Sequence, residues 1–406
     1  MEYQTHTLTN GIRLIHKQVP GIVAHCGFII NTGSRDEEPG EEGMAHFIEH
    51  AVFKGTKRRK PYHIISRLED VGGDINAYTT KEETCIHASF LNTDYKRAME
   101  LMSDMIFNSV FPEKEIEREK EIIIDEINSY RDNPSELIFD EFEELIYEGN
   151  SLAGSVLGTE ASVKSFARDD ITRFIDENYH TNEMVLASVG NISFPRVKKY
   201  FEMYFDTIPL NMRDKRKYLS SSYLPKIKRE EKDTYQAHCV IGNVAYNLKD
   251  KRRAGLHLLN NILGGPGMNS RLNMSLREKN GYTYSVEANY TPYIDSGSLV
   301  IYFGTDKENL EKSIHLAMKE FKELRDKKLG TLQLSRAKKQ LIGQIAISSE
   351  NNENYMLGMG KSYMIYDKVD TVDEIAARIN KLSAMEIQEI ANEILDKNRL
   401  STLIYT

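Results

Sequence analysis

The chain has 406 residues, a length that predicts about two domains. Charged residues make up 28% of it, as is usual in globular proteins, and the net charge is −8. The negative charge argues against nucleic acid as the main partner. No apolar run reaches the roughly 18 residues of a membrane span, and the N-terminus shows no signal or transit pattern, so we expect a cytoplasmic protein without a membrane segment.

The chain has three cysteines. Cys26, Cys85 and Cys239 are odd in number, far apart and form no CxxC pair. This pattern predicts buried free thiols, and neither a disulfide framework nor a thiolate metal site.

The first apolar run, GIVAHCGFII around Ala24-His25-Cys26, returns as YQAHCVIGNV around Ala237-His238-Cys239. A helix end, a Gly turn, two strands, an Asp and a helix also recur, over residues 65–102 and again over 273–318. Solenoid repeats are much shorter than this spacing of about 200 residues, so the pattern indicates two copies of one domain.

The fold class that these patterns predict is α+β. Strand-like segments such as TCIHASF and SLVIYFG are followed by helical patterns, which favours two homologous domains, each an antiparallel-rich β-sheet covered by α-helices on one face. The segment PLNMRDKRKYLSSSYLPKIKREEKD is polar and lacks sustained periodicity. We therefore expect an N-terminal domain at 1–210, a linker at 211–233 and a C-terminal domain at 234–406.

The strongest local signal is His46-Phe47-Ile48-Glu49-His50. On a helix each residue turns by about 100°, so His46, Glu49 and His50 share one face. Two imidazoles at this spacing can hold one zinc ion, and an adjacent carboxylate can take a proton from bound water. HxxEH is the inverted zincin motif, although two surface histidines beside an acid would also produce it.

A catalytic zinc needs a third protein ligand. The segment EKEIEREKEIIIDEINSY, residues 113–130, predicts an acid-rich helix that must end near Pro134 and offers several carboxylates. From the residues alone, any of these could be a ligand or a solvated surface acid.

Four segments follow one another along the chain in the order HFIEHAVFKGT, GGDINAYTTKEET, REKEIIIDEINSYRDNP and LREKNGYTYS. In them the chain resembles the pitrilysin, insulin-degrading enzyme and mitochondrial processing peptidase family, and especially its short bacterial members, over essentially its whole length. The resemblance implies that Glu126 is the third zinc ligand and that Glu119, two turns earlier on the same helix face, supports it. The counterpart of the motif in the second half, residues 259–263, has no ligands, so we expect one Zn²⁺ per chain.

The resemblance also implies how a peptide substrate is held. An extended peptide would add to an edge strand at Asn76 and Ala77, and Phe53 would help to form an apolar pocket for the residue after the cut bond. An ordinary edge strand and a core phenylalanine are the alternatives.

Glu136 and Asp140 match acidic positions that, in the processing peptidase, receive an arginine shortly before the cut. Two carboxylates on one helix face could bind a guanidinium group. Alternatively, Glu136 could complete a capping box with Asn133 at the start of this helix.

Arg277 and Tyr284 match a family pair that contacts substrate and supports the polarised carbonyl. Family members with four such domains enclose substrate in a chamber, and this chain supplies two. The resemblance therefore implies a homodimer in which the pair acts across the chamber, or a heterodimer with a non-catalytic homologue. The pair could instead be structural.

These observations predict a zinc-dependent endopeptidase that hydrolyses short or unfolded peptides, with Glu49 as the general base and a preference for basic residues near the cut. A non-catalytic assembly or peptide-binding subunit of the same fold is the alternative. Family members of that kind typically lose the HxxEH residues, which this chain retains, and structural zinc sites are usually closed by four ligands.

Overall fold

The structure, a computed structural model, describes residues 3–213 and 223–406. The chain forms two compact units, and each unit combines separate segments of the sequence. The first unit contains Met1–Asn128, Gly154–Lys217 and Ser348–Val369; the second contains Ser129–Ala153, Tyr218–Ile347 and Asp370–Thr406. The expected domains at 1–210 and 234–406 describe two homologous halves of the sequence, and that homology stays a prediction. The compact units differ from these halves at two places: Ser129–Ala153 belongs to the second unit and Ser348–Val369 to the first.

The first unit is built on a six-stranded sheet in the order β1-β2-β6-β3-β5-β4. All neighbours pair antiparallel except β2 and β6, which are parallel. The strands are β1 (Gln4–Thr7), β2 (Arg13–Gln18), β3 (Val23–Ile30), β4 (Asp74–Thr79), β5 (Thr84–Leu91) and β6 (Met184–Gly190).

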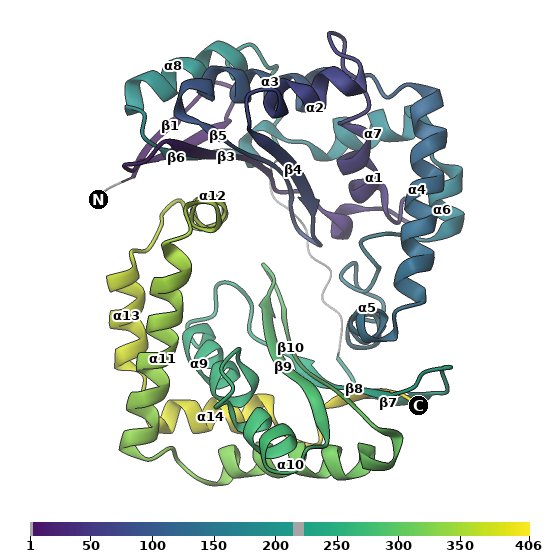
Figure 1. Ribbon diagram of the computed structural model, residues 1–406, viewed down its shortest axis with the longest axis vertical. Coiled ribbons are helices and arrows are strands. Elements are labelled where there is room, and N and C mark those ends of the chain that lie inside the picture. Colours follow the sequence, from purple (N-terminus) through teal and green to yellow (C-terminus); the bar gives the residue numbers. More distant parts are fainter. Residues whose placement is uncertain (1–2, 214–222) are drawn as a thin grey trace. The chain divides into compact units, whose positions relative to one another are not determined.

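Most helices of the first unit cover one face of this sheet, where a large apolar core forms. Figure 1 shows α2, α3 and α8 on that side. The helices on this side and around the sheet are α1 (Met44–Ala51), α2 (Pro61–Glu69), α3 (Tyr95–Asn108), α4 (Glu113–Arg131), α6 (Glu160–Ser165), α7 (Arg168–Asn178) and α8 (Phe194–Phe205). The last residues of α4, from Ser129, fall in the second unit.

The opposite face of the first sheet carries a single helix from far along the chain, α12 (Asn352–Tyr366). Its Met356, Met359 and Tyr363 pack against Ile15 of β2 and against β6. Gly360 makes this approach possible, because a Cβ there would lie 2.5 Å from the Ile29 side chain. Both faces of β3 and β6 are therefore buried, which explains their continuous apolar sequences.

The second unit repeats the arrangement around a five-stranded sheet in the order β7-β11-β8-β10-β9. Here β7 and β11 are parallel and the remaining neighbours are antiparallel. The strands are β7 (Ile227–Glu230), β8 (Ala237–Val244), β9 (Thr283–Pro292), β10 (Gly297–Thr305) and β11 (Ser401–Tyr405).

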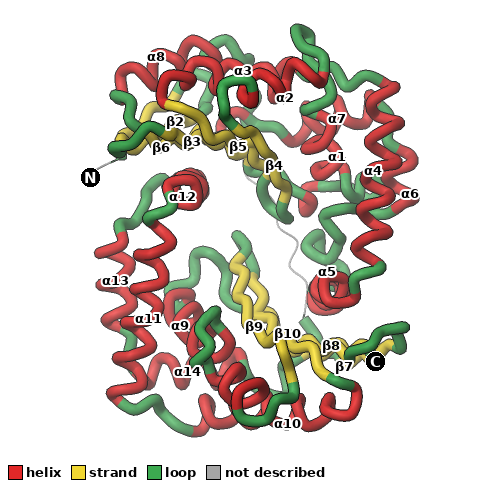
Figure 2. The backbone as a smooth tube through the Cα atoms, viewed as in Figure 1, coloured by secondary structure: helices red, strands yellow, loops and turns green. Residues whose placement is uncertain are grey.

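One face of the second sheet packs on a helical core and the other on α5 (Pro134–Ile146), which lies within the N-terminal half of the sequence. Figure 2 shows α5 on one side of β8 and α10 on the other. Gly242 lets α5 approach, because a Cβ there would lie 2.8 Å from the Phe142 ring. The helices of the core side and its surroundings are α9 (Arg253–Gly264), a π-helix (Asn273–Glu278), α10 (Leu310–Asp326), α11 (Thr331–Ser349), α13 (Val372–Lys381) and α14 (Ala384–Ile394).

The predicted α+β class with two antiparallel-rich sheets is confirmed, with two differences. Helices cover both faces of each sheet, because α5 and α12 fill the second face. The expected linker 211–233 contains β7, an exposed edge strand. Its sequence IKRE lacks the alternation of apolar and polar residues from which a strand could be predicted. The rest of that linker includes residues 214–222, which lie outside the described part.

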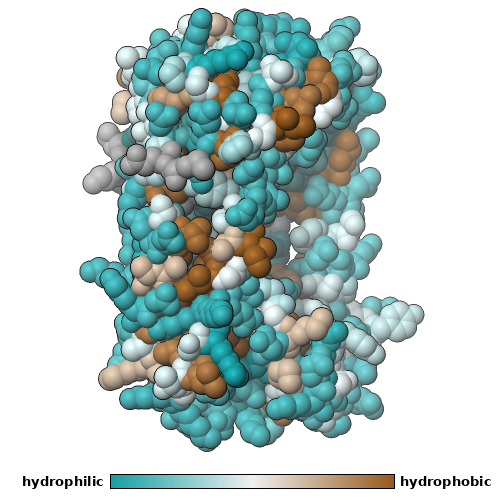
Figure 3. Space-filling model, turned by 60° about the vertical axis from the view of Figure 1, so that its left-hand side comes forward, coloured by the Kyte–Doolittle hydropathy of each residue, from teal (hydrophilic) through white to brown (hydrophobic). Residues whose placement is uncertain are grey.

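The three cysteines are free and buried, as predicted. The face drawn in Figure 3 is mostly hydrophilic, with smaller apolar patches between the polar side chains. In the described residues, no helix combines the length and apolar character needed to span a membrane.

We expect His16 on β2 to make the stability of the first unit depend on pH. It is buried, its Nε2–H donates to the Ile192 carbonyl at 3.0 Å, and burial lowers its pKa from the ordinary value. The neutral ring is therefore favoured in the folded state, and stability present above about pH 6.5 is lost as the pH falls through the folded pKa. We expect the melting temperature to fall less between pH 7 and pH 5 in His16→Gln than in the wild type, as measured by calorimetry. His63→Gln, on an exposed histidine, should keep the wild-type slope.

Candidate metal centre

The HxxEH motif lies on α1, as the sequence predicts. The helix begins after Gly43, whose φ of +90° favours glycine, and a Cβ there would lie 2.5 Å from the Leu157 carbonyl oxygen. Phe47 and Ile48 enter the apolar core. Their burial fixes the rotation of the helix, so that His46, Glu49 and His50 occupy a different face.

His46, His50 and Glu126 form a group in which one possible ligand atom from each lies within 4.8 Å of the others. The Glu126 Oε2 atom is 3.9 Å from His46 Nε2 and 3.8 Å from His50 Nε2. The two imidazole rings are 4.7 Å apart between centroids. The structure therefore brings a carboxylate of α4 to the two histidines of α1.

The donor set of this group fits zinc. Ligands about 2.1 Å from a tetrahedral ion lie about 3.4 Å from one another, close to the separations found here. Burial, helped by the nearby His50, lowers the pKa of His46 to about 4, so its ring is neutral near pH 7, as ligation requires. Three protein ligands leave a fourth position for water or substrate, which is typical of catalytic and not of structural zinc.

Glu119 stands behind His50. Its buried carboxylate accepts from His50 Nδ1 at 3.2 Å and pairs with Lys54 Nζ at 2.9 Å. Burial alone would raise the pKa of Glu119, but these two partners outweigh it and the pKa is lowered. An ionised Glu119 fixes the tautomer of His50 that presents Nε2 to a metal.

Replacing Glu119 by Gln should weaken zinc binding by about 10- to 100-fold, because outer partners of this kind orient the ligand and raise its basicity. Competition against a chromophoric chelator would measure the change. Glu121→Gln, an exposed acid on the same helix, is the control and should bind zinc as the wild type does. Unchanged affinity in Glu119→Gln would show that His50 needs no such partner.

Glu49 is half-buried and takes no part in the His-His-Glu group. Burial raises the pKa of its carboxyl, while hydrogen bonds from Thr79 lower it. Thr79 ends β4 and its hydroxyl also approaches the Ala45 carbonyl at 3.5 Å. No pattern in the sequence indicates this interaction, because Thr79 lies about 30 residues from Glu49 and only packing of β4 against α1 brings them together.

Strand β4 lies at the edge of its sheet and next to α1. Among the described residues it pairs only with β5, so its outer edge is unpaired by any strand. Asn76 is exposed and donates to Asp74 at 2.9 Å, and Ala77 is half-buried against the core. Phe53 is also partly buried against this core, so its place agrees in part with the core alternative. Substrate contacts at these residues stay predictions.

Glu136 and Asp140 lie on α5, which belongs to the second compact unit. Asn133 is the N-cap of this helix, as the alternative expected, but the capping box is wrong: the Asn133 side chain makes no capping hydrogen bond and instead accepts from the Ser135 hydroxyl. Glu136 is exposed, as a residue that meets a solvent-borne ligand must be.

Arg277 and Tyr284 also lie in the second unit. Arg277 is on the π-helix, an uncommon element that often marks functional sites, and Tyr284 is the second residue of β9 and is 83% exposed. Neither residue belongs to the apolar core of its unit. Their role in binding substrate stays a prediction.

Comparisons with known proteins show to which family the chain belongs. Residues 14–160 match the family model described as insulinase (peptidase family M16), and residues 165–341 match that of the peptidase M16 inactive domain. Zinc protease YmxG of Bacillus subtilis is 31% identical over 403 residues, covering 98% of this chain and 97% of the relative. The chain belongs to peptidase family M16. The family also includes a 27% identical relative, the mitochondrial-processing peptidase subunit beta of Saccharomyces cerevisiae, matched over 98% of this chain and 90% of its own length.

Two solved structures share the fold of this M16 member. A protease from Helicobacter pylori has a TM-score of 0.89 at 19% identity, with 100% of this chain and 99% of that chain covered. A peptidase M16 inactive domain from Pseudomonas fluorescens has a TM-score of 0.93 at 19% identity, covering 100% and 98%.

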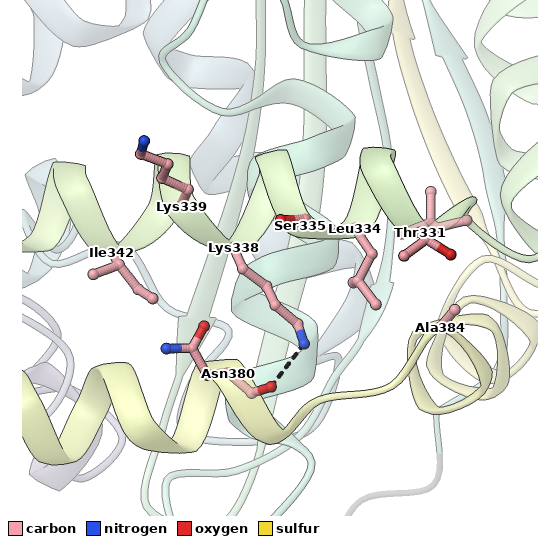
Figure 4. A pocket seen from close by; sticks show the side chains of 9 residues that line it. Thr331, Leu334, Ser335, Lys338, Lys339, Ile342, Asn380 and Ala384 are labelled. Carbon is pink, nitrogen blue, oxygen red and sulfur yellow. Dashed lines mark hydrogen bonds between the residues drawn. The ribbon is translucent and has the colours of Figure 1, made fainter.

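The second unit contains a cavity of about 540 Å³ between α11, α13 and the start of α14. Figure 4 shows Lys338 donating to the Asn380 carbonyl across it, at 2.8 Å, while Lys339 points away. No histidine, aspartate or glutamate lines this cavity. The cavity therefore lacks the carboxylate and imidazole groups that the His46, His50 and Glu126 group offers to a metal.

Proposed function

We propose that this M16 member is a zinc-dependent endopeptidase that hydrolyses short or unfolded peptides. The observation that carries the proposal is the convergence of His46, His50 and Glu126 within 4.8 Å, with Glu49 one residue from His50 on the same helix. When bound there, zinc would polarise the scissile carbonyl and lower the pKa of its water to about 7. The relatives named zinc proteases support this choice of metal.

The side chains of the chain itself would do the remaining work. Glu49, whose raised pKa lies nearer to neutrality than that of a free carboxylate, would accept a proton and return it to the leaving amine. Thr79 would hold this carboxyl in place through its hydrogen bonds. The unpaired edge of β4 would align an extended peptide through backbone hydrogen bonds, which demand no particular sequence.

The finer parts of the proposal concern assembly and specificity. Two chains would form a closed chamber, in which Arg277 and Tyr284 of one chain contact substrate at the other chain's zinc site. A homodimer needs no further gene product, and a heterodimer with a non-catalytic homologue is the alternative. Glu136 and Asp140 would receive an arginine, since two carboxylates four residues apart on α5 match a guanidinium group.

Cleavage of a quenched fluorescent peptide containing arginine would test the proposal. We expect hydrolysis by zinc-loaded protein, its loss after chelation and its return with added zinc. No hydrolysis by folded, zinc-loaded protein would contradict the enzyme and favour a non-catalytic subunit. A matched peptide with alanine in place of arginine addresses specificity: equal rates would remove the roles of Glu136 and Asp140.

A further inference from the structure

A carboxylate outside the zinc motif closes the amino end of α1. Glu37 Oε2 accepts the Gly43 N–H and its Oε1 accepts the Ala45 N–H, each at 2.9 Å. Burial raises the pKa of Glu37, and the same two N–H donors oppose that rise because they stabilise the ionised carboxylate. Gly43 has no side chain to cap the helix itself, so Glu37 takes over that role from six residues away.

The position of this contact matters because α1 is short. The helix has eight residues, His46 lies in its first turn and immediately follows Ala45, and His50 lies in its last. A helix of this length is marginal without tertiary contacts, and its first N–H groups have no partners inside the helix. Loss of the Glu37 contacts would therefore loosen the turn that carries His46 before the turn that carries His50.

Backbone hydrogen bonds fix the segment that leads to Glu37. The preceding residues are fixed to the turn between β4 and β5, since Ser34 N–H donates to the Thr80 carbonyl at 3.1 Å and Arg35 N–H to the Lys81 carbonyl at 2.9 Å. The Arg35 side chain also pairs with Glu82. This turn follows Thr79, the partner of Glu49. The loop that carries Glu37 and the side chain of Glu49 are therefore both held by the end of β4 and the turn that follows it.

We propose that Glu37 is a positioning residue for the zinc centre, setting the place of His46 relative to His50 and Glu126 by accepting the first N–H groups of α1. This inference rests on the proposed zinc site but goes beyond the motif, because Glu37 is neither a ligand nor the base.

The test compares Glu37→Ala, Glu37→Gln and, as a matched control, Glu38→Gln, which alters the exposed neighbour. Zinc affinity is measured by competition with a chromophoric chelator, and ligand geometry by the visible absorption of Co²⁺-substituted protein. We expect Glu37→Ala to bind zinc about 10-fold more weakly, with a shifted Co²⁺ spectrum. Glu37→Gln, which retains one acceptor oxygen, should be intermediate, and Glu38→Gln unchanged. Where peptide is hydrolysed, kcat should fall with little change in KM.

A folded Glu37→Ala protein with wild-type zinc affinity and an unaltered Co²⁺ spectrum would overturn the inference, even if its melting temperature fell, because Glu37 would then be only a helix cap. If Glu37→Ala does not fold, Glu37→Gln decides by the same two measurements. Both readouts work without peptide hydrolysis. A wild-type protein that binds zinc and cleaves no peptide would therefore refute the proposed function and leave the role of Glu37 open to the same decision.

Discussion

Exchange of Glu49 for Gln is expected to lower kcat/KM for peptide hydrolysis by about 100- to 10,000-fold, the usual contribution of a general base. Gln has the shape of Glu but cannot accept a proton at neutral pH. Zinc should stay bound, because Glu49 lies outside the His46, His50 and Glu126 group. Hydrogen bonds from Thr79 on β4, which lower the pKa of Glu49, do not depend on the metal ligands.

The measurement pairs initial rates on the fluorescent peptide with zinc content after gel filtration. Glu69→Gln, which alters an exposed acid on α2, serves as the control for a lost negative charge and should match the wild type. A zinc-bound Glu49→Gln protein that still hydrolyses peptide at the wild-type rate would rule out Glu49 as the base. A variant that loses zinc would instead show that Glu49 helps to hold the metal.

The sequence predicted α1 and its reactive face because the relevant contacts are local. Helical spacing alone sets His46, Glu49 and His50 on one side, and the apolar Phe47 and Ile48 turn the other side into the core. The same applies to α4, whose end at Arg131 agrees with the helix stop expected near Pro134.

The third ligand could not be deduced from the residues in the same way. Several glutamates lie along α4, and only the packing of Ile116, Ile123 and Ile127 decides which of them faces α1. Glu119 shares that buried stripe, as a charge can when His50 and Lys54 satisfy it. The family resemblance pointed to Glu126 and Glu119, and the structure places Glu126 beside both histidines and Glu119 beside His50.

The exchange of α5 and α12 between the compact units could not be predicted either. Met356, Met359 and Tyr363 form an apolar stripe that any sheet face could accept. Their partner is settled by close approach, through Gly360 against β3 and β6, and such contacts join residues more than 150 positions apart. The AHC repeat reveals two equivalent strands, β3 and β8, but not which distant helix covers each.

Removal of the charge on Glu126 should have the second large effect. Glu126→Gln replaces the one anionic member of the group by a weaker neutral donor, so zinc affinity should fall by more than the about 10- to 100-fold attributable to an outer residue. Chelator competition measures this, and Asp125→Asn, an exposed neighbour, should bind zinc normally. Glu126→Gln with wild-type affinity would exclude Glu126 as a ligand.

The two variants also separate the two roles of carboxylates in this site. Glu126→Gln should lose activity because its zinc is lost, so excess zinc should restore part of the rate. Glu49→Gln should be saturated with zinc already, and added zinc should restore nothing. Glu49 and Glu126 both lie near His50. If either substitution merely disturbed the site as a whole, the two variants would lose zinc to a similar extent and would recover similarly when zinc is added. Opposite responses to added zinc would therefore assign metal binding to Glu126 and proton transfer to Glu49.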